Sequence, residues 1–191
     1  LEAHPRFQPL SHPVIGVFLG GETPDYALPT AFVESLVKQV MSACVQLRGS
    51  YMVTTSRRTP HQAERLLTER VSHDPHCRLL LLASRDQLNG TMEGMLGAAD
   101  VAVVTGESIS MVSEACASGR GVIVIEPPLR KAQAATTKHQ RFVSELMQAG
   151  YGRRGALAEL SLAIQRAVAE QPNTRRLDNV AAVRDAVRPL L

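Results

Sequence analysis

Two glycines and two arginines stand directly after short apolar runs of the sequence, where they could contact an anion. Gly20 and Gly21 follow one run, and Ser56, Arg57 and Arg58 follow the next. Glycine lets a backbone turn sharply and approach a ligand closely, and guanidinium groups match the oxygens of a phosphate. These residues therefore indicate a site for a phosphate-bearing anion. Tight turns, and arginines that are solvated or paired with carboxylates, are the structural alternative.

A third polar segment covers residues 105–114 and leads into a helical pattern. The candidate contacts in it are Thr105, Gly106, Glu107, Ser108, Ser110, Met111, Ser113 and Glu114. Free backbone N–H groups at the beginning of a helix attract an anion. In the alternative interpretation Ser108 or Ser110 only caps the helix, and Glu114 is the capping partner of a serine.

The elements that must position these segments alternate along the chain. Apolar runs rich in β-branched residues predict buried strands at 14–19, 51–55, 78–82, 101–105 and 121–125. Helical spacing predicts helices at 29–48, 61–71, 91–99, 110–118, 139–149, 157–170 and 179–190. This order predicts an α/β, Rossmann-like parallel sheet of about five or six strands with helices on both faces, ending in helices. Ligands of such sheets bind at the carboxyl ends of the strands.

The composition narrows the classes of function. A net charge of +3 and a chain without tryptophan speak against a nucleic-acid-binding protein. The three cysteines, Cys44, Cys77 and Cys116, lie in apolar or helical patterns and indicate buried thiols in a reducing compartment. No apolar run reaches the roughly 20 residues of a membrane helix. We therefore expect a cytoplasmic protein.

Metal and serine chemistry have weak support. His73, Asp74 and His76 form a polar turn, but a third clear ligand is missing from it. A serine hydrolase would need a Gly-x-Ser-x-Gly elbow and a histidine partner, and the segment around Ser108 offers neither. We expect no metal and no cofactor.

Two longer motifs resemble a known family. They are T-T-S-R-R-T-P at 54–60 and V-T-G-E-S-I-S-M-V-S-E-A at 104–115, accompanied by the strand that ends in Leu19, Gly20 and Gly21. Together they resemble the mitochondrial-fission ELM-like family of bacteria and plants, which is related to GT-B glycosyltransferases. The resemblance covers most of the chain but only the carboxyl-terminal half of a family member. We expect a lead-in at 1–13, a Rossmann-like domain at 14–191, and an amino-terminal partner domain outside this sequence.

The resemblance implies a function for the domain. In GT-B enzymes this half holds a nucleoside-diphosphate sugar, and by that analogy Glu114 bonds the ribose. The glycines and the hydroxyls of Thr105, Ser108 and Ser110 then approach the diphosphate, and Arg57 or Arg58 offsets its charge. The family's Asn-Pro-Tyr-like segment is replaced here by Asn-Gly-Thr-Met at 89–92.

The expected partners are the nucleotide-sugar donor and an acceptor domain or another subunit, with no nucleic acid. The resemblance also allows peripheral membrane contact through the other half. We expect the isolated domain to bind the donor without turnover. The alternative is a non-catalytic interaction module that kept the fold and lost the sugar chemistry.

Overall fold

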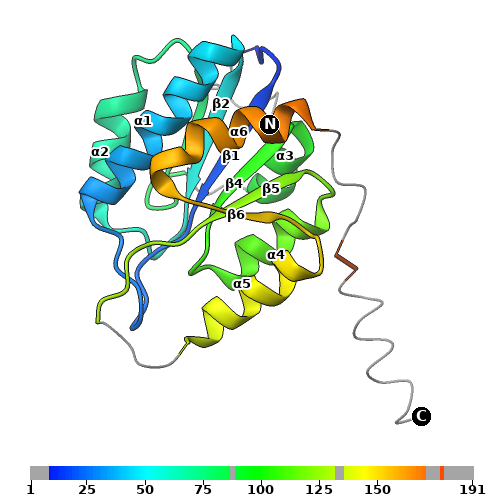
Figure 1. Cartoon of the computed structure of the whole chain (residues 1–191). Coiled ribbons are helices and arrows are strands. Elements are labelled where there is room, and N and C mark those ends of the chain that lie inside the picture. The colour runs from blue at the N-terminus through cyan, green and yellow to red at the C-terminus, as the bar shows by residue number, and fades with distance from the viewer. Residues whose placement is uncertain (1–8, 87–88, 132–135, 171–176, 179–191) are drawn as a thin grey trace.

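All strands of the central sheet run parallel. The computed structural model describes residues 9–86, 89–131, 136–170 and 177–178 (Figure 1). The strands are β1 (Val14–Leu19), β2 (Ser50–Thr55), β3 (Cys77–Leu81), β4 (Val101–Thr105), β5 (Gly121–Ile125) and β6 (Arg153–Gly155). They lie in the order β3-β2-β1-β4-β5-β6. Leu19 pairs with Thr55, and Thr105 pairs with Ile125, so the loops that follow these strands leave the sheet at one edge, which we call the carboxyl edge.

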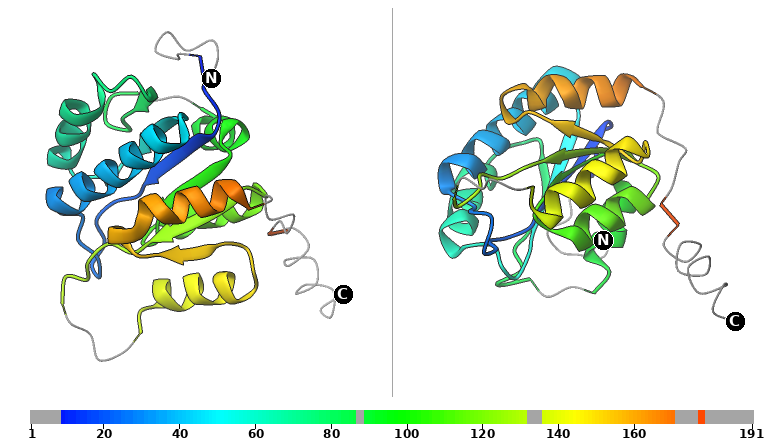
Figure 2. Two further views of the ribbon diagram at one scale, coloured as in Figure 1. Left: turned by 45° about the horizontal axis from the view of Figure 1, so that its top comes forward. Right: turned by 60° about the horizontal axis from the view of Figure 1, so that its bottom comes forward.

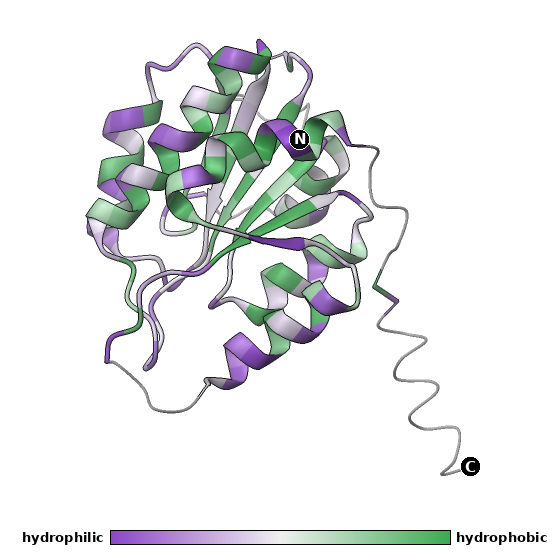
Figure 3. Cartoon of the chain, in the orientation of Figure 1, coloured by the Kyte–Doolittle hydropathy of each residue, from purple (hydrophilic) through white to green (hydrophobic). Residues whose placement is uncertain are grey.

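Helices cover both faces of this sheet (Figure 2). They are α1 (Thr30–Leu47), α2 (His61–Val71), α3 (Thr91–Ala98), α4 (Ile109–Ala117), α5 (Lys138–Gln148) and α6 (Leu160–Ala169), and a 3₁₀ turn (Leu157–Glu159) precedes α6. Helices α1, α2 and α6 pack on one face, against strand residues such as Ile15 and Val103. Helices α3, α4 and α5 pack on the other face, against alternating residues such as Phe18 and Val104. The central strands are therefore buried on both sides, as their continuous apolar runs predict (Figure 3).

The predicted α/β fold is confirmed, with one local correction at 151–155. The sequence analysis predicted no strand there, but Arg153–Gly155 forms β6 and pairs with β5. Two charged side chains in a strand of three residues give no apolar pattern, and Figure 3 shows this edge strand as hydrophilic. Backbone pairing with β5 makes the strand. The helix predicted at 179–190 lies outside the described residues.

Candidate functional site

Three loops meet at the carboxyl edge and are hydrogen-bonded to one another. The Gly20 N–H donates to Thr105 Oγ1 over 2.8 Å, which joins the loop after β1 to the end of β4. The Glu22 N–H donates to the Arg58 carbonyl oxygen over 3.2 Å, and the Thr59 hydroxyl donates to the Gly20 carbonyl oxygen. The loop after β2 is thereby fixed against the loop after β1. The sequence interpretation placed these segments at one edge, and the structure brings them into direct contact.

The glycine turn, Gly20 and Gly21, is packed too tightly for side chains. A Cβ atom on Gly20 would lie 2.2 Å from Glu107 Oε1, and one on Gly21 would lie 2.2 Å from the Arg58 carbonyl carbon. Contacts within the chain therefore account for both glycines. Close approach of a ligand to this turn stays a prediction.

Glu107 is a carboxylic acid enclosed between these loops. Glu107 is 1% exposed, and its Oε1 accepts a hydrogen bond from the Thr105 hydroxyl over 3.0 Å. Oε2 is buried and has no hydrogen-bond partner among the described residues. Burial raises the pKa of Glu107 to about 7, although backbone N–H groups, the Thr105 hydroxyl and the Arg58 charge oppose the rise. The group therefore titrates near neutral pH.

Arg57 and Arg58 supply positive charge at this edge. Both residues are exposed, and neither guanidinium forms a hydrogen bond or ion pair with another residue in the described part of the chain. The turn that presents them is held by the Ser56 side chain, because the Arg58 N–H donates to Ser56 Oγ over 3.2 Å. Arg130, by contrast, is bound to Glu22 over 2.6 Å. Arg57 and Arg58 can thus meet an incoming anion without breaking an internal pair.

A pocket of about 420 Å³ lies beside Arg57, and we call it the Arg57 pocket. Its lining residues are Thr54, Thr55, Arg57, Ala83, Asp86, Asn89, Thr91, Met92 and Met111. They come from the end of β2, the loop between β3 and α3, the beginning of α3 and the beginning of α4. Hydroxyl, amide and carboxylate groups stand here beside two thioethers. Such a lining can bond the polar edges of a small ligand and pack against its flat faces.

Hydrogen bonds fix the loop after β3, which forms a wall of the Arg57 pocket. The sequence analysis did not include this loop in the site. The Thr55 hydroxyl donates to Glu64 Oε1 over 2.6 Å, and the Ala83 N–H donates to Thr55 Oγ1 over 2.8 Å. The Leu82 N–H donates to Asp86 Oδ2 over 3.0 Å. These bonds tie the loop after β3 to β2 and α2. Residues 89–92 differ from the family's Asn-Pro-Tyr-like segment, yet Asn89 lines the pocket.

Among the described residues no side chain caps the beginning of α4, so the capping interpretation is wrong. Ser108 occupies the N-cap position and is buried, but its side chain forms no capping hydrogen bond. The Ser113 hydroxyl donates instead to the Ile109 carbonyl oxygen over 2.8 Å. Ser110 is exposed. The N–H groups of the first turn are therefore not satisfied by Ser108 or a capping box.

Glu114 does not line the pocket beside Arg57. It lines a second cavity of about 420 Å³ between α3 and α4, the Glu114 groove, together with Glu93, Leu96, Gly97, Ala117, Ser118 and Arg120. Glu114 is exposed at the residue level, and partial burial of its carboxyl together with the Glu93 charge raises its pKa. Met111, one helical turn earlier, lines the Arg57 pocket. The two cavities thus share α3 and α4 as walls.

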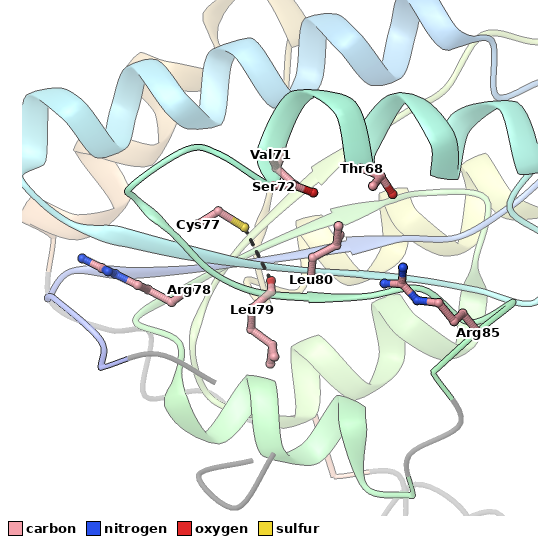
Figure 4. Close-up of a pocket in the computed structure, with 8 residues that line it drawn as sticks. All are labelled: Thr68, Val71, Ser72, Cys77, Arg78, Leu79, Leu80 and Arg85. Atoms are coloured by element: carbon pink, nitrogen blue, oxygen red, sulfur yellow. Dashed lines mark hydrogen bonds between the residues drawn. The ribbon is translucent and has the colours of Figure 1, made fainter. Parts of the chain in front are cut away.

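A cavity of about 320 Å³ on the outer side of β3 contains none of the predicted site residues (Figure 4). The Cys77 thiol donates there to the Leu79 carbonyl oxygen over 3.8 Å. Burial raises the pKa of Cys77 to about 11, so this thiol stays protonated at neutral pH and is a poor nucleophile.

Two remaining sequence features have structural partners. The Tyr51 hydroxyl donates to Asp74 over 2.8 Å, and His76 Nδ1 lies 2.8 Å from the Gly49 carbonyl oxygen. These side chains hold the polar turn against β2.

Within the described residues, none of the helices combines the length and apolar character that crossing a membrane requires.

Comparison with known sequences assigns the family. The family model described as Mitochondrial fission ELM1 matches residues 1–191. The chain belongs to this family. The mitochondrial fission protein ELM1 of Arabidopsis thaliana is 26% identical over 122 residues, which is 64% of this chain and 27% of that protein. The ELM1-family chain therefore spans less than a third of the curated relative that it matches.

Solved structures with the same fold include glycosyltransferases. The glycotransferase of kitacinnamycin matches with a TM-score of 0.55 and 15% identity, over 95% of this chain and 41% of that chain. A Listeria monocytogenes protein described as a UDP-N-acetylglucosamine 2-epimerase matches with a TM-score of 0.60 and 11% identity, over 92% and 44%. The glycosyltransferase VinC, solved with DTDP, matches with a TM-score of 0.53 and 13% identity, over 88% and 36%. At these identities the likeness shows a GT-B glycosyltransferase-like, Rossmann-like fold.

Proposed function

We propose that this ELM1-family domain binds a nucleoside-diphosphate sugar at the carboxyl edge of its sheet. The observation that carries the proposal is the pair of exposed guanidinium groups at Arg57 and Arg58, which form no hydrogen bond or ion pair among the described residues. Arg57 also lines a polar pocket. Guanidinium groups next to a pocket of this size suit a ligand that joins a charged diphosphate to a flat base. The fold neighbours that act on or were solved with nucleotides support the same class of ligand.

Each part of the ligand has a candidate partner. The diphosphate would lie against the two arginines and the beginning of α4, whose N–H groups and helix dipole favour negative charge. The base would occupy the Arg57 pocket, where Asn89 and Thr91 offer polar contacts. A ribose held by Glu114 would extend past Met111 into the Glu114 groove, and a carboxylate can accept hydrogen bonds from two hydroxyls.

In a transfer reaction this chain would stabilise the leaving group. The bond between the anomeric carbon and the diphosphate oxygen breaks, the diphosphate leaves with the electron pair, and an acceptor oxygen forms the new bond. Arg57 and Arg58 would offset the charge that develops on the diphosphate. The acceptor and the base that removes its proton would come from another domain or subunit, so the chain alone binds the donor without turnover.

Calorimetric titration with UDP, GDP and ADP tests the proposal, with Arg57→Gln as the variant. Arg48→Gln is the matched control, because Arg48 is also exposed but follows α1 at the opposite edge of the sheet. We expect one nucleotide to bind and Arg57→Gln to weaken it tenfold or more, on the order of 1.4 kcal/mol, while the control leaves affinity unchanged. Binding that both variants weaken equally would place the ligand elsewhere.

Glu114→Ala tests the ribose contact separately. It should also weaken the nucleotide by about tenfold, while inorganic pyrophosphate, which has no ribose, should bind the variant and the parent equally. Failure of all three nucleotides to bind at millimolar concentration would refute the proposal.

A further inference from the structure

The buried carboxyl of Glu107 lies directly beneath the glycine turn. Glu107 Oε1 occupies the space where a Gly20 side chain would begin, and it accepts the Thr105 hydroxyl. Thr105 Oγ1 in turn accepts the Gly20 N–H. A short chain of hydrogen bonds therefore connects the acid to the backbone of the turn that stands at the anion site.

The surroundings of this carboxyl favour its neutral form. Its second oxygen is buried and accepts no hydrogen bond from the described residues, and a buried carboxylate oxygen without a donor is costly. Arg58 is the cation that stabilises the ionised form, through its charge rather than through an ion pair. The same guanidinium is one of the two that would meet a diphosphate.

We propose that Glu107 is a positioning residue that couples diphosphate binding at the carboxyl edge to the uptake of one proton. The inference rests on the proposed function. A diphosphate attracts Arg58 and adds negative charge above the glycine turn. Both changes disfavour the carboxylate, so the acid takes up a proton as the ligand binds and the Thr105 contact keeps the turn in place.

The other groups around this carboxyl do not take this part. His139 is also reached by the Arg58 charge, but burial, Lys138 and Arg58 lower its pKa from 6.5, so its imidazole is neutral above neutral pH, where the coupling is measured. The loop after β1 contributes the backbone of Gly20 and Gly21, β4 contributes Thr105, and the residue that precedes α4 contributes Ser108. None of these groups titrates near neutral pH. Two other carboxylates at this edge are engaged elsewhere, since Glu22 binds Arg130 and Glu126 binds Arg154.

Calorimetric titration of the full chain with inorganic pyrophosphate and with UDP, GDP and ADP tests the coupling. Each titration is run at about pH 6, 7 and 8.5, in pairs of buffers with different ionisation enthalpies, so that proton uptake is counted directly. Above neutral pH we expect the affinity to fall by about tenfold per pH unit and proton uptake to approach one. The affinity of Glu107→Gln should not change with pH once the titration of the ligand's own phosphate is subtracted. That titration is common to both proteins.

Glu145→Gln is the control, because Glu145 is an exposed carboxylate on α5. It should keep the pH dependence of the parent. Equal pH dependence in the parent and in Glu107→Gln would overturn the coupling and leave the proposed nucleotide site standing. If Glu107→Gln does not fold, the proton count of the parent decides, and a count near zero overturns the inference. Binding by no ligand at any pH would overturn the proposed function and the coupling together.

Discussion

Replacing Glu107 with glutamine should stabilise the protein at high pH and leave its stability at low pH unchanged. Burial raises the pKa of Glu107 from 4.5 to about 7 in the folded chain. Between these values the folded state holds a proton that the unfolded state has lost, so stability falls as the pH rises through this window. A shift of this size corresponds to roughly 3 kcal/mol once the pH exceeds the folded pKa. Glutamine keeps the shape and the acceptor for Thr105 but carries no charge.

Urea unfolding followed by circular dichroism measures this effect, since the chain has no tryptophan to report by fluorescence. The free energy of unfolding of Glu107→Gln and of the parent should agree below a pH of about 4.5 and diverge steadily up to about 7. The free energy of unfolding of Glu145→Gln should match that of the parent at every pH, because Glu145 is exposed. A Glu107→Gln curve that is offset equally at every pH would refute the argument, because it would show a packing effect and no buried titration.

Two further predictions concern packing and thiol chemistry. Gly21→Ala should destabilise the fold by about 1–3 kcal/mol and more than Gly20→Ala. The added methyl group meets the Arg58 backbone in the first variant and side-chain atoms of Glu107 and Ser108 in the second. Equal urea midpoints for the two variants would contradict this. Iodoacetamide at about pH 8 should label the folded chain far more slowly than the unfolded chain, because burial raises the pKa values of the thiols. Equally fast labelling of the folded chain would show that the thiols are accessible and would contradict this prediction. The thiols are Cys44, with a pKa of about 12, and Cys77 and Cys116, each with a pKa of about 11.

The sequence contains most of the fold because the central strands are buried on both faces. Continuous β-branched runs mark β1, β4 and β5, and breaks such as Gly119, with a φ of 74°, mark where a helix ends. The exception is β6, whose Arg153 and Arg154 resemble a loop. That strand depends on backbone pairing with β5, which no side-chain pattern reports.

The sequence predicts the edge at which the site residues gather but not their roles within it. Arg57 and Arg58 could be placed because each follows a predicted strand. Glu107 belongs to the polar segment 105–114, but the glycine turn that encloses it comes from the distant loop after β1. Sequence spacing does not contain that contact. Asn89 was missed because no local motif marks its loop. A hydrogen bond between Ala83 and Thr55 brings that loop to the pocket.

The central claim is that a nucleotide binds at the carboxyl edge of this sheet. Amide NMR spectra of the labelled chain, recorded during titration with UDP, GDP and ADP, test it most directly. With one of these nucleotides, the account predicts saturating shifts in the segments 20–21, 56–59 and 105–111 and in the loop that contains Asn89. Shifts confined to the outer side of β3, or no shifts with any of the three, would contradict it.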